Sequence, residues 1–473
     1  MKSVKIKNSW LANSDARLDA SFHLSEGVNT RRIISKFCPY PITLLKDECR
    51  KLFKGNIHKR VYVSSLKNGL EFYTASDLLK VGISNPKYVS IKYSPHLDDL
   101  MLYKDWILIT RSGTLGKLVF TNRNHEGTIG TDDLVRIIPK EKSILKGVLF
   151  SFLSSKYGNG LLTQSGYGGV VQHIEPHHLE QLPIPVFPDS FQRLINEKIV
   201  SAINLREGAK ELIEKAQKHL KIKADLPNLE PSEYEYFGNQ SEGRSLSVFS
   251  RNRSEITSTT FNAFNYSKKI ERLELRVKQG DYLELFDCLD ENKLFSSGSF
   301  KRLELHSPKS IKLINQSDIF NIKKEGKMLA RRFVREDKLV NYGEVLIAGV
   351  GTLAEGETFC RAIFANEELE GQLISGEFIR MKTNAKVPSG YLYAWLSSDY
   401  GFRFIRKTHT GTKLCRPIQK LLRKIPVPIL EQESMLQIDE QVKKAHSMLS
   451  DALNLETQAI DLVEKEIESW QES

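Results

Sequence analysis

The apolar residues of this chain follow two different periodicities. Residues 61–140 contain short runs of β-branched and aromatic residues, separated by Gly, Asn, Pro and Asp, a pattern typical of short strands. Residues 144–155 and 390–398 instead place apolar side chains at helical spacing. We therefore expect α+β globules with sheet cores and a few short helices. The predicted strands are Val61–Val63, Trp106–Thr110, Leu118–Phe120 and Leu134–Ile138.

The chain also repeats itself. GVLFSFLSSKYG begins at Gly147 and GYLYAWLSSDYG begins at Gly390, 243 residues later. The same shift places LPIPV (182–186) on IPVPI (425–429), and RLDASFH (17–23) on TFNAFNY (260–266). A period this long lets each copy bury a complete core, unlike the short repeats of a solenoid. The sequence therefore predicts a tandem duplication of one domain.

Alternating prolines follow each globule. Proline fixes φ and lacks a backbone donor, so LPIPV and IPVPI stop any helix, and we expect each string to leave its globule as an extended segment.

A narrow apolar stripe follows each proline string. Such a stripe is typical of a coiled-coil seam, although an amphipathic helix lying on its own globule is the alternative. Two stripes at equivalent places favour pairing of the helices, because each then covers the other. The stripes are Ile195, Ile199, Ala202, Ala209, Leu212, Ala216 and Leu220, then Ile438, Val442, Ala445, Leu449, Ala452, Leu455, Ala459, Val463 and Ile467.

These features give a domain plan. We expect a connector at 225–247, rich in Pro, Glu, Ser and Gly and fastened by Tyr234, Tyr236 and Phe237. The full plan is a first recognition globule at 1–187, a first helix at 188–224, the connector, a second globule at 248–430 and a second helix at 431–473.

The amino-acid composition indicates which kind of partner the chain binds. The 473 residues include 69 Lys and Arg against 58 Asp and Glu, a net charge of +11. This surplus favours an anionic partner such as nucleic acid, although many cytosolic proteins carry as much without binding DNA. The five cysteines are widely spaced, and no apolar stretch approaches the length of a membrane span. We expect reduced thiols, a cytoplasmic location and no membrane contact.

Motifs for catalysis are missing from the sequence. No P-loop pattern occurs, and the glycines of 165–173 do not follow a clear strand as a dinucleotide loop requires. Glu291 and Lys293 resemble a nuclease fragment, but without further suitably spaced carboxylates. His173, His177 and His178 lack the acidic or Cys partners of a metal site. We expect no catalytic residue, bound metal or cofactor in this chain.

A polar, glycine-containing loop precedes each proline string, at 163–173 and 407–416. Glycine permits close backbone approach, Gln and His can bind base edges, and Lys and Arg suit phosphates or guanine. Ordinary surface loops are the alternative. Their equivalent positions in the two copies favour a paired recognition role.

The order of these segments resembles the specificity subunit of a type I restriction-modification system. GTLGK or GTLAE, FLSSKYG or WLSSDYG, a polar loop, a proline string and a long helix occur in this order twice, over nearly the whole chain. The resemblance implies two target recognition domains that each read one half of a split DNA site from the major groove. It also implies an antiparallel pair of spacer helices and no catalytic activity.

The resemblance further implies the partners. These are double-stranded DNA, two methyltransferase subunits that use S-adenosylmethionine, and restriction subunits that use ATP, with Mg expected in the partner subunits. The second copy has Ala354 and Glu355 where the first has Gly116 and Lys117, which puts a DNA role for Lys117 in doubt. The candidate DNA-binding residues are Arg111, Lys117, Gln164, Ser165, Tyr167, Gln172, His173, Lys327, Arg331, Lys407, Thr410, Thr412, Lys413 and Arg416.

Three other functions stay open at the level of sequence. The chain could be a stand-alone DNA-modifying or DNA-cleaving enzyme, the recognition subunit of a related phage-defence system, or a protein-interaction adaptor whose basic charge is incidental.

Overall fold

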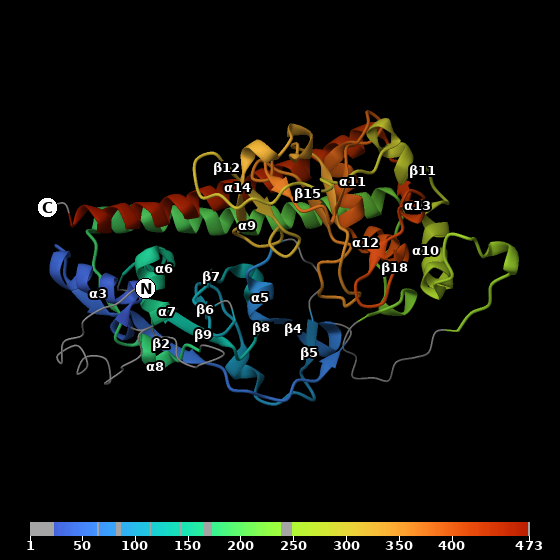
Figure 1. The fold of residues 1–473 in the computed structure, drawn as a ribbon. Helices are drawn as coiled ribbons and strands as arrows, with labels where there is room; N and C mark the ends of the chain where they lie inside the picture. Colours follow the sequence, from blue (N-terminus) through green and yellow to red (C-terminus); the bar gives the residue numbers. More distant parts are fainter. Residues whose placement is uncertain are drawn as a thin grey trace. The chain divides into compact units, whose positions relative to one another are not determined.

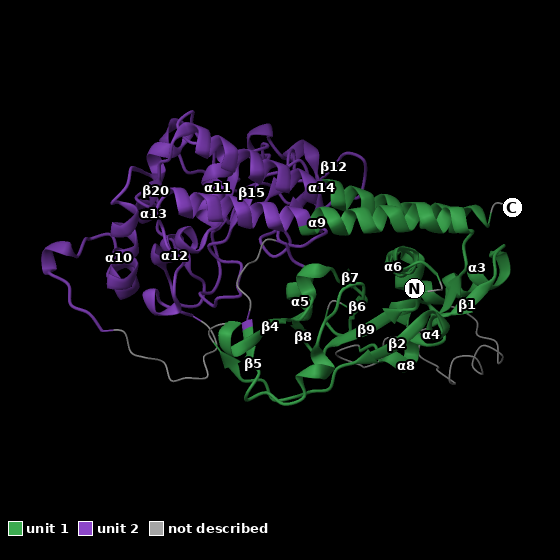
Figure 2. Ribbon diagram, turned by 180° about the vertical axis from the view of Figure 1, so that it is seen from behind, with its two compact units in different colours: residues 1–79, 88–207, 451–473 green, residues 80–87, 208–450 purple. Residues whose placement is uncertain are grey.

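The computed structural model describes residues 23–63, 66–81, 87–113, 115–141, 144–164, 173–237 and 248–471 (Figure 1). Ser165, Tyr167 and Gln172 lie outside these ranges. The chain divides into two compact units (Figure 2). Unit 1 comprises residues 1–79, 88–207 and 451–473, and unit 2 comprises residues 80–87 and 208–450.

Unit 1 contains two four-stranded sheets. The first is antiparallel, in the order β2 (Cys49–Lys54), β9 (Leu134–Pro139), β6 (Ile107–Thr110) and β7 (Leu118–Phe120). The second has the order β3 (Tyr62–Val63), β5 (Lys87–Ser90), β4 (Gly69–Tyr73) and β8 (Ile129–Gly130). The helices of this globule are α3 (Glu26–Phe37), α4 (Leu45–Glu48), α5 (Ala75–Leu78), α6 (Lys146–Ser154), α7 (Lys156–Gln164) and α8 (Pro176–Leu179).

Unit 2 repeats this plan with shorter sheets. Strand β14 (Val345–Ala348) lies between β15 (Ala362–Phe364) and β17 (Phe378–Met381), and β12 (Ser310–Ile314) lies between β13 (Lys327–Ala330) and β16 (Leu373–Ile374). Strands β12 and β16 pair in parallel, as β4 and β8 do in unit 1. The helices of this globule are α10 (Lys268–Val277), α11 (Ser389–Ser397), α12 (Asp399–Lys407) and α13 (Gln419–Leu422). The predicted duplication of an α+β domain is confirmed.

The repeated SSxYG motif ends one helix and starts the next. The hydroxyl of Ser398 accepts a hydrogen bond from the Gly401 N–H at 3.2 Å, and Ser155 does the same for Gly158. A Cβ on Gly401 would stand 2.2 Å from the carbonyl oxygen of Trp395, and one on Gly158 would stand 2.0 Å from that of Phe152. The motif therefore recurs because the helix junction needs a serine cap and a residue without a side chain.

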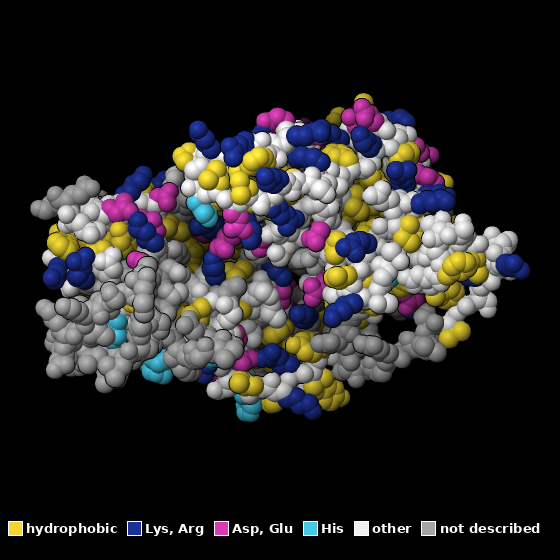
Figure 3. Space-filling view, viewed as in Figure 1, with side chains coloured by type: hydrophobic (Ala, Val, Ile, Leu, Met, Phe, Trp, Pro, Cys, Tyr) yellow, Lys and Arg dark blue, Asp and Glu magenta, His cyan; other side chains and the backbone are white. Residues whose placement is uncertain are grey.

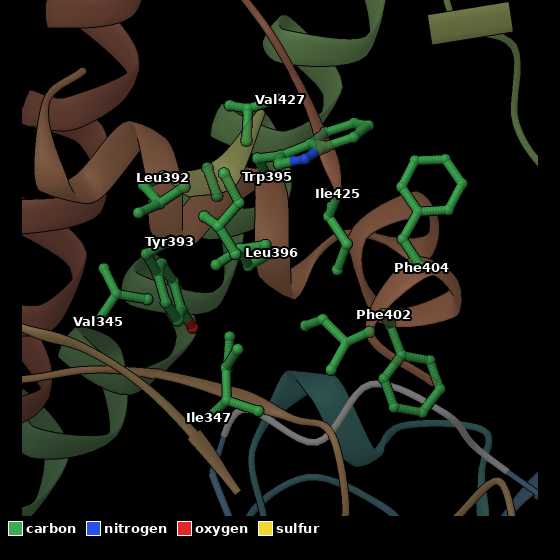
Figure 4. Packing of buried hydrophobic residues seen from close by; sticks show 14 of the residues in the cluster. Val345, Ile347, Leu392, Tyr393, Trp395, Leu396, Phe402, Phe404, Ile425 and Val427 are labelled. Atoms are coloured by element: carbon green, nitrogen blue, oxygen red, sulfur yellow. The ribbon is translucent and has the colours of Figure 1, made fainter. Parts of the chain in front are cut away.

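Helix α11 is buried on all sides because it is apolar all round. Its residues Leu392, Trp395 and Leu396 lie among side chains from β14 and from the second proline string, as Figure 4 shows. Strand β14 is also buried throughout its length, which explains its unbroken apolar run.

The proline strings are extended, as predicted, but they are packed strands and not free exits. The first forms β10 (Pro183–Pro185), antiparallel to β1 (Ile42–Leu44), and the second forms β20 (Pro426–Pro428), antiparallel to β11 (Tyr282–Glu284). The donor-less proline nitrogens face away from the partner strand, the position in which a sheet tolerates proline. The Pro426 carbonyl on that side accepts a hydrogen bond from Trp395 Nε1 at 3.0 Å.

The two long helices that the stripes predict are α9 (Asp189–Lys223) and α14 (Gln432–Ser469). In unit 1 the core contains Ile195 and Ile199 together with Val463 and Ile467. In unit 2 it contains Ala216 and Leu220 with Ile438 and Val442. Rising numbers in α9 match falling numbers in α14, so the helix segments pack antiparallel, as expected.

The alternative to helix pairing, in which each long helix lies on a globule, is present as well. The same stripes also enter the cores of the globules, since Gly147 of α6 packs against the backbone of Asn196 and the side chain of Ile199. No helix in the described part of the chain is long and apolar enough to cross a membrane.

Candidate nucleic-acid interface

The described ends of the first polar loop are anchored to the globule. Gln164, the last residue of α7, is buried, and its side-chain Oε1 accepts a hydrogen bond from Arg31 Nε at 3.3 Å. His173, at the other end, is half-buried. The next residue, Ile174, donates its N–H to the Arg111 carbonyl at 3.1 Å. The loop thus starts and ends on fixed points of unit 1.

Arg111, which bonds to Ile174 just after this loop, belongs to an ionic network of unit 1. Its guanidinium forms ion pairs with Glu175 and, at 3.4 Å, with Asp133, and Lys54 Nζ lies 3.0 Å from Glu175. Burial alone would raise the pKa of Glu175, but the hydrogen bonds from Arg111 and Lys54 outweigh it and lower the pKa to about 2. Only 17% of the Arg111 side chain is exposed. A DNA phosphate would therefore have to compete with two carboxylates for this guanidinium.

Lys117 is exposed at the end of the SGTLGK turn. This turn is held on α7, because Asn159 donates a hydrogen bond to the Gly116 carbonyl at 2.7 Å. Gly116 has φ of 75°, and a Cβ there would stand 3.0 Å from the Thr163 methyl group. The turn and the end of α7 therefore share one corner of unit 1.

The second polar loop is a β-hairpin. Strands β18 (His409–Thr410) and β19 (Arg416–Pro417) pair antiparallel, and Gly411 at the turn has φ of 92°. Cys415 donates its N–H to the Gly351 carbonyl at 2.7 Å, so the hairpin is joined to the VGTLAE segment. Four candidate residues are exposed on this hairpin: Thr410, Thr412, Lys413 and Arg416.

Lys407 does not belong to that exposed group. Its ammonium lies 2.6 Å from the Glu274 carboxylate, and 17% of the side chain is exposed. Lys327 and Arg331 lie in or next to a different sheet, at β13. Lys327 pairs with Glu304 at 2.5 Å, and Arg331 pairs with Glu336. The structure thus brings together the hairpin residues but not all the predicted candidates.

Two asparagines hold the hairpin from behind. Asn265 donates to the His409 carbonyl at 3.0 Å, and Asn262 donates to the same oxygen at 3.3 Å. Both belong to the repeated TFNAFNY segment. The repeat identified this segment in the sequence but did not predict that it holds the hairpin.

Glu355, at the end of the VGTLAE segment to which the hairpin is joined, is buried. Each of its carboxylate oxygens lies 2.8 Å from one terminal nitrogen of Arg403, and its Oε1 also accepts the Phe237 N–H at 3.0 Å. Burial would raise the pKa of Glu355, but Arg403 and Arg406 reverse the effect and lower it. Position 117 of unit 1 is thus an exposed Lys, whereas the equivalent Glu355 of unit 2 is buried. There it pairs with Arg403 and Arg406 and anchors the connector through the Phe237 N–H.

Sequence reasoning missed two fully buried arginines, Arg136 on β9 and Arg380 on β17. Arg136 donates to the carbonyls of Leu134 and Gly130, each at 3.1 Å. Arg380 forms an ion pair with Glu344 at 2.8 Å. The two arginines stand 244 residues apart, so the duplication offered a signal for both.

No family model and no curated protein matches the chain. The solved structures that are similar to it include three that cover 91–92% of its length. The type I restriction-modification S subunit from M. genitalium has 15% sequence identity, a TM-score of 0.34 and 96% of its own chain covered. The HsdS subunit from Thermoanaerobacter tengcongensis has 12% identity, a TM-score of 0.27 and 96% covered.

The third similar structure comes from a study titled as the structural basis of complex assembly and conformational transition of the type I R-M system. It has 12% identity, a TM-score of 0.27 and 97% of its chain covered. The solved structures to which this chain is similar thus include S subunits of type I restriction-modification systems.

Proposed function

We propose that this chain is a non-catalytic subunit that recognises a bipartite DNA site in a type I restriction-modification complex. The observation that carries the proposal is the duplicated setting of the polar loops. In unit 1 the loop follows α7 and ends where Ile174 bonds to Arg111, and in unit 2 it follows α12 and ends where Cys415 bonds to Gly351. Two equivalent loops suit two half-sites.

The hairpin of unit 2 has a suitable form for reading a base sequence. The major groove admits a two-stranded β-ribbon, and Thr, Lys and Arg side chains provide donors for base edges and phosphates. Thr410, Thr412, Lys413 and Arg416 supply these groups. In unit 1 we assign the corresponding role to Gln164, Ser165, Tyr167, Gln172 and His173, with Arg111 and Lys117 beside them.

The long helices complete the proposal. A helix of 35 residues is roughly 50 Å long at about 1.5 Å per residue. We propose that the paired helices fix the spacing of the half-sites and dock two methyltransferase subunits. Those subunits would use S-adenosylmethionine, and restriction subunits would use ATP and Mg, in the cytoplasm. One of the similar structures comes from work on assembly of such a complex, which is in keeping with this role.

A change in the hairpin tests the proposal. The full chain, co-purified with its cognate methyltransferase subunits, is expected to direct methylation of a split DNA sequence. The double variant Lys413→Ala, Arg416→Ala should relax the sequence requirement in one half-site and leave the other unchanged, since the hairpin belongs to one unit alone. Sequencing of methylated sites in a random library measures both halves at once.

Lys278→Ala serves as the matched control, because Lys278 is an exposed cation of unit 2 outside the hairpin. Loss of specificity in both halves would contradict independent reading. Methylation or cleavage by the purified chain alone, given S-adenosylmethionine or Mg, would contradict a non-catalytic role. If the chain showed no affinity for DNA even in complex with the methyltransferase, the alternative function of a protein-interaction adaptor would be favoured.

A further inference from the structure

Arg302 of unit 2 has a counterpart in unit 1. In unit 1, Tyr62 pairs with Val89 of β5, and Arg60 stands two residues before Tyr62. In unit 2, Glu304 pairs with Leu329 of β13, and Arg302 stands two residues before Glu304. The orders β5, β4, β8 and β13, β12, β16 correspond strand by strand. Arg60 and Arg302 therefore occupy the same place in the two sheets.

The acidic partner of this arginine is present in one copy and missing in the other. Asp132 stands two residues after β8 and forms an ion pair with Arg60. Gly376 stands at the same distance after β16. Within the part of the chain that the structure describes, Arg302 makes no hydrogen bond or ion pair, and its guanidinium lies 5.6 Å from the centre of the Phe300 ring. Glycine thus stands where unit 1 has the aspartate that pairs with this arginine.

A pocket of about 270 Å³ occupies this place. It is lined by Gly298, Ser299, Phe300, Arg302, Gly376 and Glu377. A Cβ on Gly376 would stand 2.8 Å from the Gly298 carbonyl oxygen, so the close approach of these two segments requires glycine. A side chain at position 376 would therefore strain the backbone, and a carboxylate cannot be restored there without cost.

The segment that leads into the pocket is held by contacts with Arg380 of β17. Phe295 and Arg380 exchange backbone hydrogen bonds of 3.1 and 2.8 Å, and Arg380 Nη1 lies 3.3 Å from Ser297 Oγ. The chain is thereby pinned to β17 immediately before Gly298. The segment that enters the pocket is therefore fixed at its start, which lowers the ordering needed to accept a ligand.

Two cations lie at the pocket, Arg302 in its lining and Lys338 beside it. Lys338 Nζ lies 3.1 Å from the point where a Cβ of Gly298 would stand. Lys301, the chain neighbour of Arg302, lies 4.7 Å from the centre of the Phe333 ring. Glu377 is the acidic residue of the lining. Figure 3 shows Lys and Arg side chains, with Asp and Glu among them, interleaved with apolar groups on the visible face of unit 2.

We infer that this pocket receives a phosphodiester group of the DNA backbone, which Arg302 binds in place of the missing carboxylate. A guanidinium presents the same pair of N–H donors to a phosphate as to a carboxylate. A phosphate therefore takes, beside Arg302, the role that the Asp132 carboxylate has beside Arg60 in unit 1. The inference rests on the proposed function and deepens it, because it names a phosphate subsite separate from the hairpin.

The salt dependence of DNA binding tests this subsite. The full chain is titrated with a labelled DNA duplex at several salt concentrations, and the slope of log K against log salt is measured. Each phosphate contact contributes about 0.9 to the slope on duplex DNA. Arg302→Met should therefore weaken binding and lower the slope by about 0.9. Glu377→Gln should tighten binding, because it removes a charge that repels phosphate.

Arg60→Met is the matched control. Arg60 is already paired with Asp132, so the variant should keep the wild-type slope, with thermal unfolding used to check that each variant folds. A duplex with one neutral methylphosphonate, moved along the strand, adds a positional readout. At one position it should weaken binding by the wild-type chain and have no further effect on Arg302→Met.

The outcomes separate the two proposals. If the wild-type chain binds DNA with a salt-dependent affinity and Arg302→Met keeps its slope, the phosphate subsite is wrong while the proposed function stands. If the wild-type chain shows no salt-dependent DNA affinity, alone or with its methyltransferase, the proposed function itself is wrong.

Discussion

At the scale of single residues, the buried charges are positioned by partners that lie far away in the sequence. Arg380 and Glu344 stand 36 residues apart and are almost fully buried. Arg380 also donates to the Leu339 and Lys338 carbonyls at 2.5 and 2.8 Å. Such a pair contributes little net stability over an apolar pair but is costly to break, because the remaining charge is left without a partner.

Replacement of Arg380 by Met is therefore expected to destabilise unit 2 by about 3–5 kcal/mol, the usual cost of stranding a buried charge. Urea unfolding followed by tryptophan fluorescence measures the change, since Trp395 lies in the core of the same unit. The double variant Arg380→Met, Glu344→Gln should recover part of the loss. An equal loss in both variants would contradict the stranded-charge explanation.

Glu175 makes the stability of unit 1 depend on pH. Its pKa in the folded chain is about 2, below the ordinary value of 4.5, so its contribution to stability is fully present above pH 4.5. That contribution is lost as the pH falls from 4.5 towards 2. The difference in unfolding free energy between wild type and Glu175→Gln should therefore be constant above about pH 5 and shrink below it. Denaturant unfolding at pH 7, 5 and 3 measures this, and a pH-independent difference would contradict it.

At the scale of elements, short motifs determine where helices break and how closely they pack. The SSxYG junction needs its glycine for contact with a carbonyl in both units, at Gly158 and Gly401. The glycine of the long helix has a softer neighbour, because a Cβ on Gly208 would meet only the mobile end of the Met448 side chain at 2.7 Å.

Alanine substitutions should separate these two kinds of glycine. Gly401→Ala forces the backbone apart and is expected to cost at least about 1–3 kcal/mol, as overpacking does. Gly208→Ala gains up to about 1 kcal/mol of helix propensity, from which the displacement of Met448 subtracts. Thermal unfolding should thus show a clear loss for the first variant and no loss for the second. The reverse order would contradict this account of the motif.

At the scale of the whole molecule, the C-terminal helix serves the cores of both units. Ala459, Val463 and Ile467 lie in the core of unit 1, although they are close to the end of the chain. Ile438 and Val442 lie in the core of unit 2. The compact units thus share α9 and α14, and neither unit is a continuous stretch of sequence.

A chain truncated after Ser450 is therefore expected to lose structure in unit 1. Hydrogen exchange should show lost amide protection in β9 and α6, near the beginning of the chain, while β14 of unit 2 stays protected. A single substitution on the exposed face of α14, Lys465→Ala, is the control and should leave both units protected. If amide protection were lost only in α14, or equally in both units, the assignment of the end of α14 to the core of unit 1 would be contradicted.

The sequence by itself determined the features that depend on local chemistry and on repetition. Periodicity predicted the two long helices and four strands of unit 1, the shift of 243 predicted the duplication, and alternating prolines predicted extended segments. These predictions succeeded because helix and strand periodicities, and the constraints of proline, act between near neighbours.

Only the tertiary structure decided which charged residues are buried and which are exposed. Arg111 and Lys407 resembled surface cations in the sequence, yet each is held by a carboxylate more than 60 residues away. Only the structure showed that Asp132 lies beside Arg60 and that Gly376 takes the equivalent place beside Arg302. The physical reason is that ion pairs, close backbone approaches and pockets form between segments that the fold brings together, and periodicity along one segment carries no record of its distant partner.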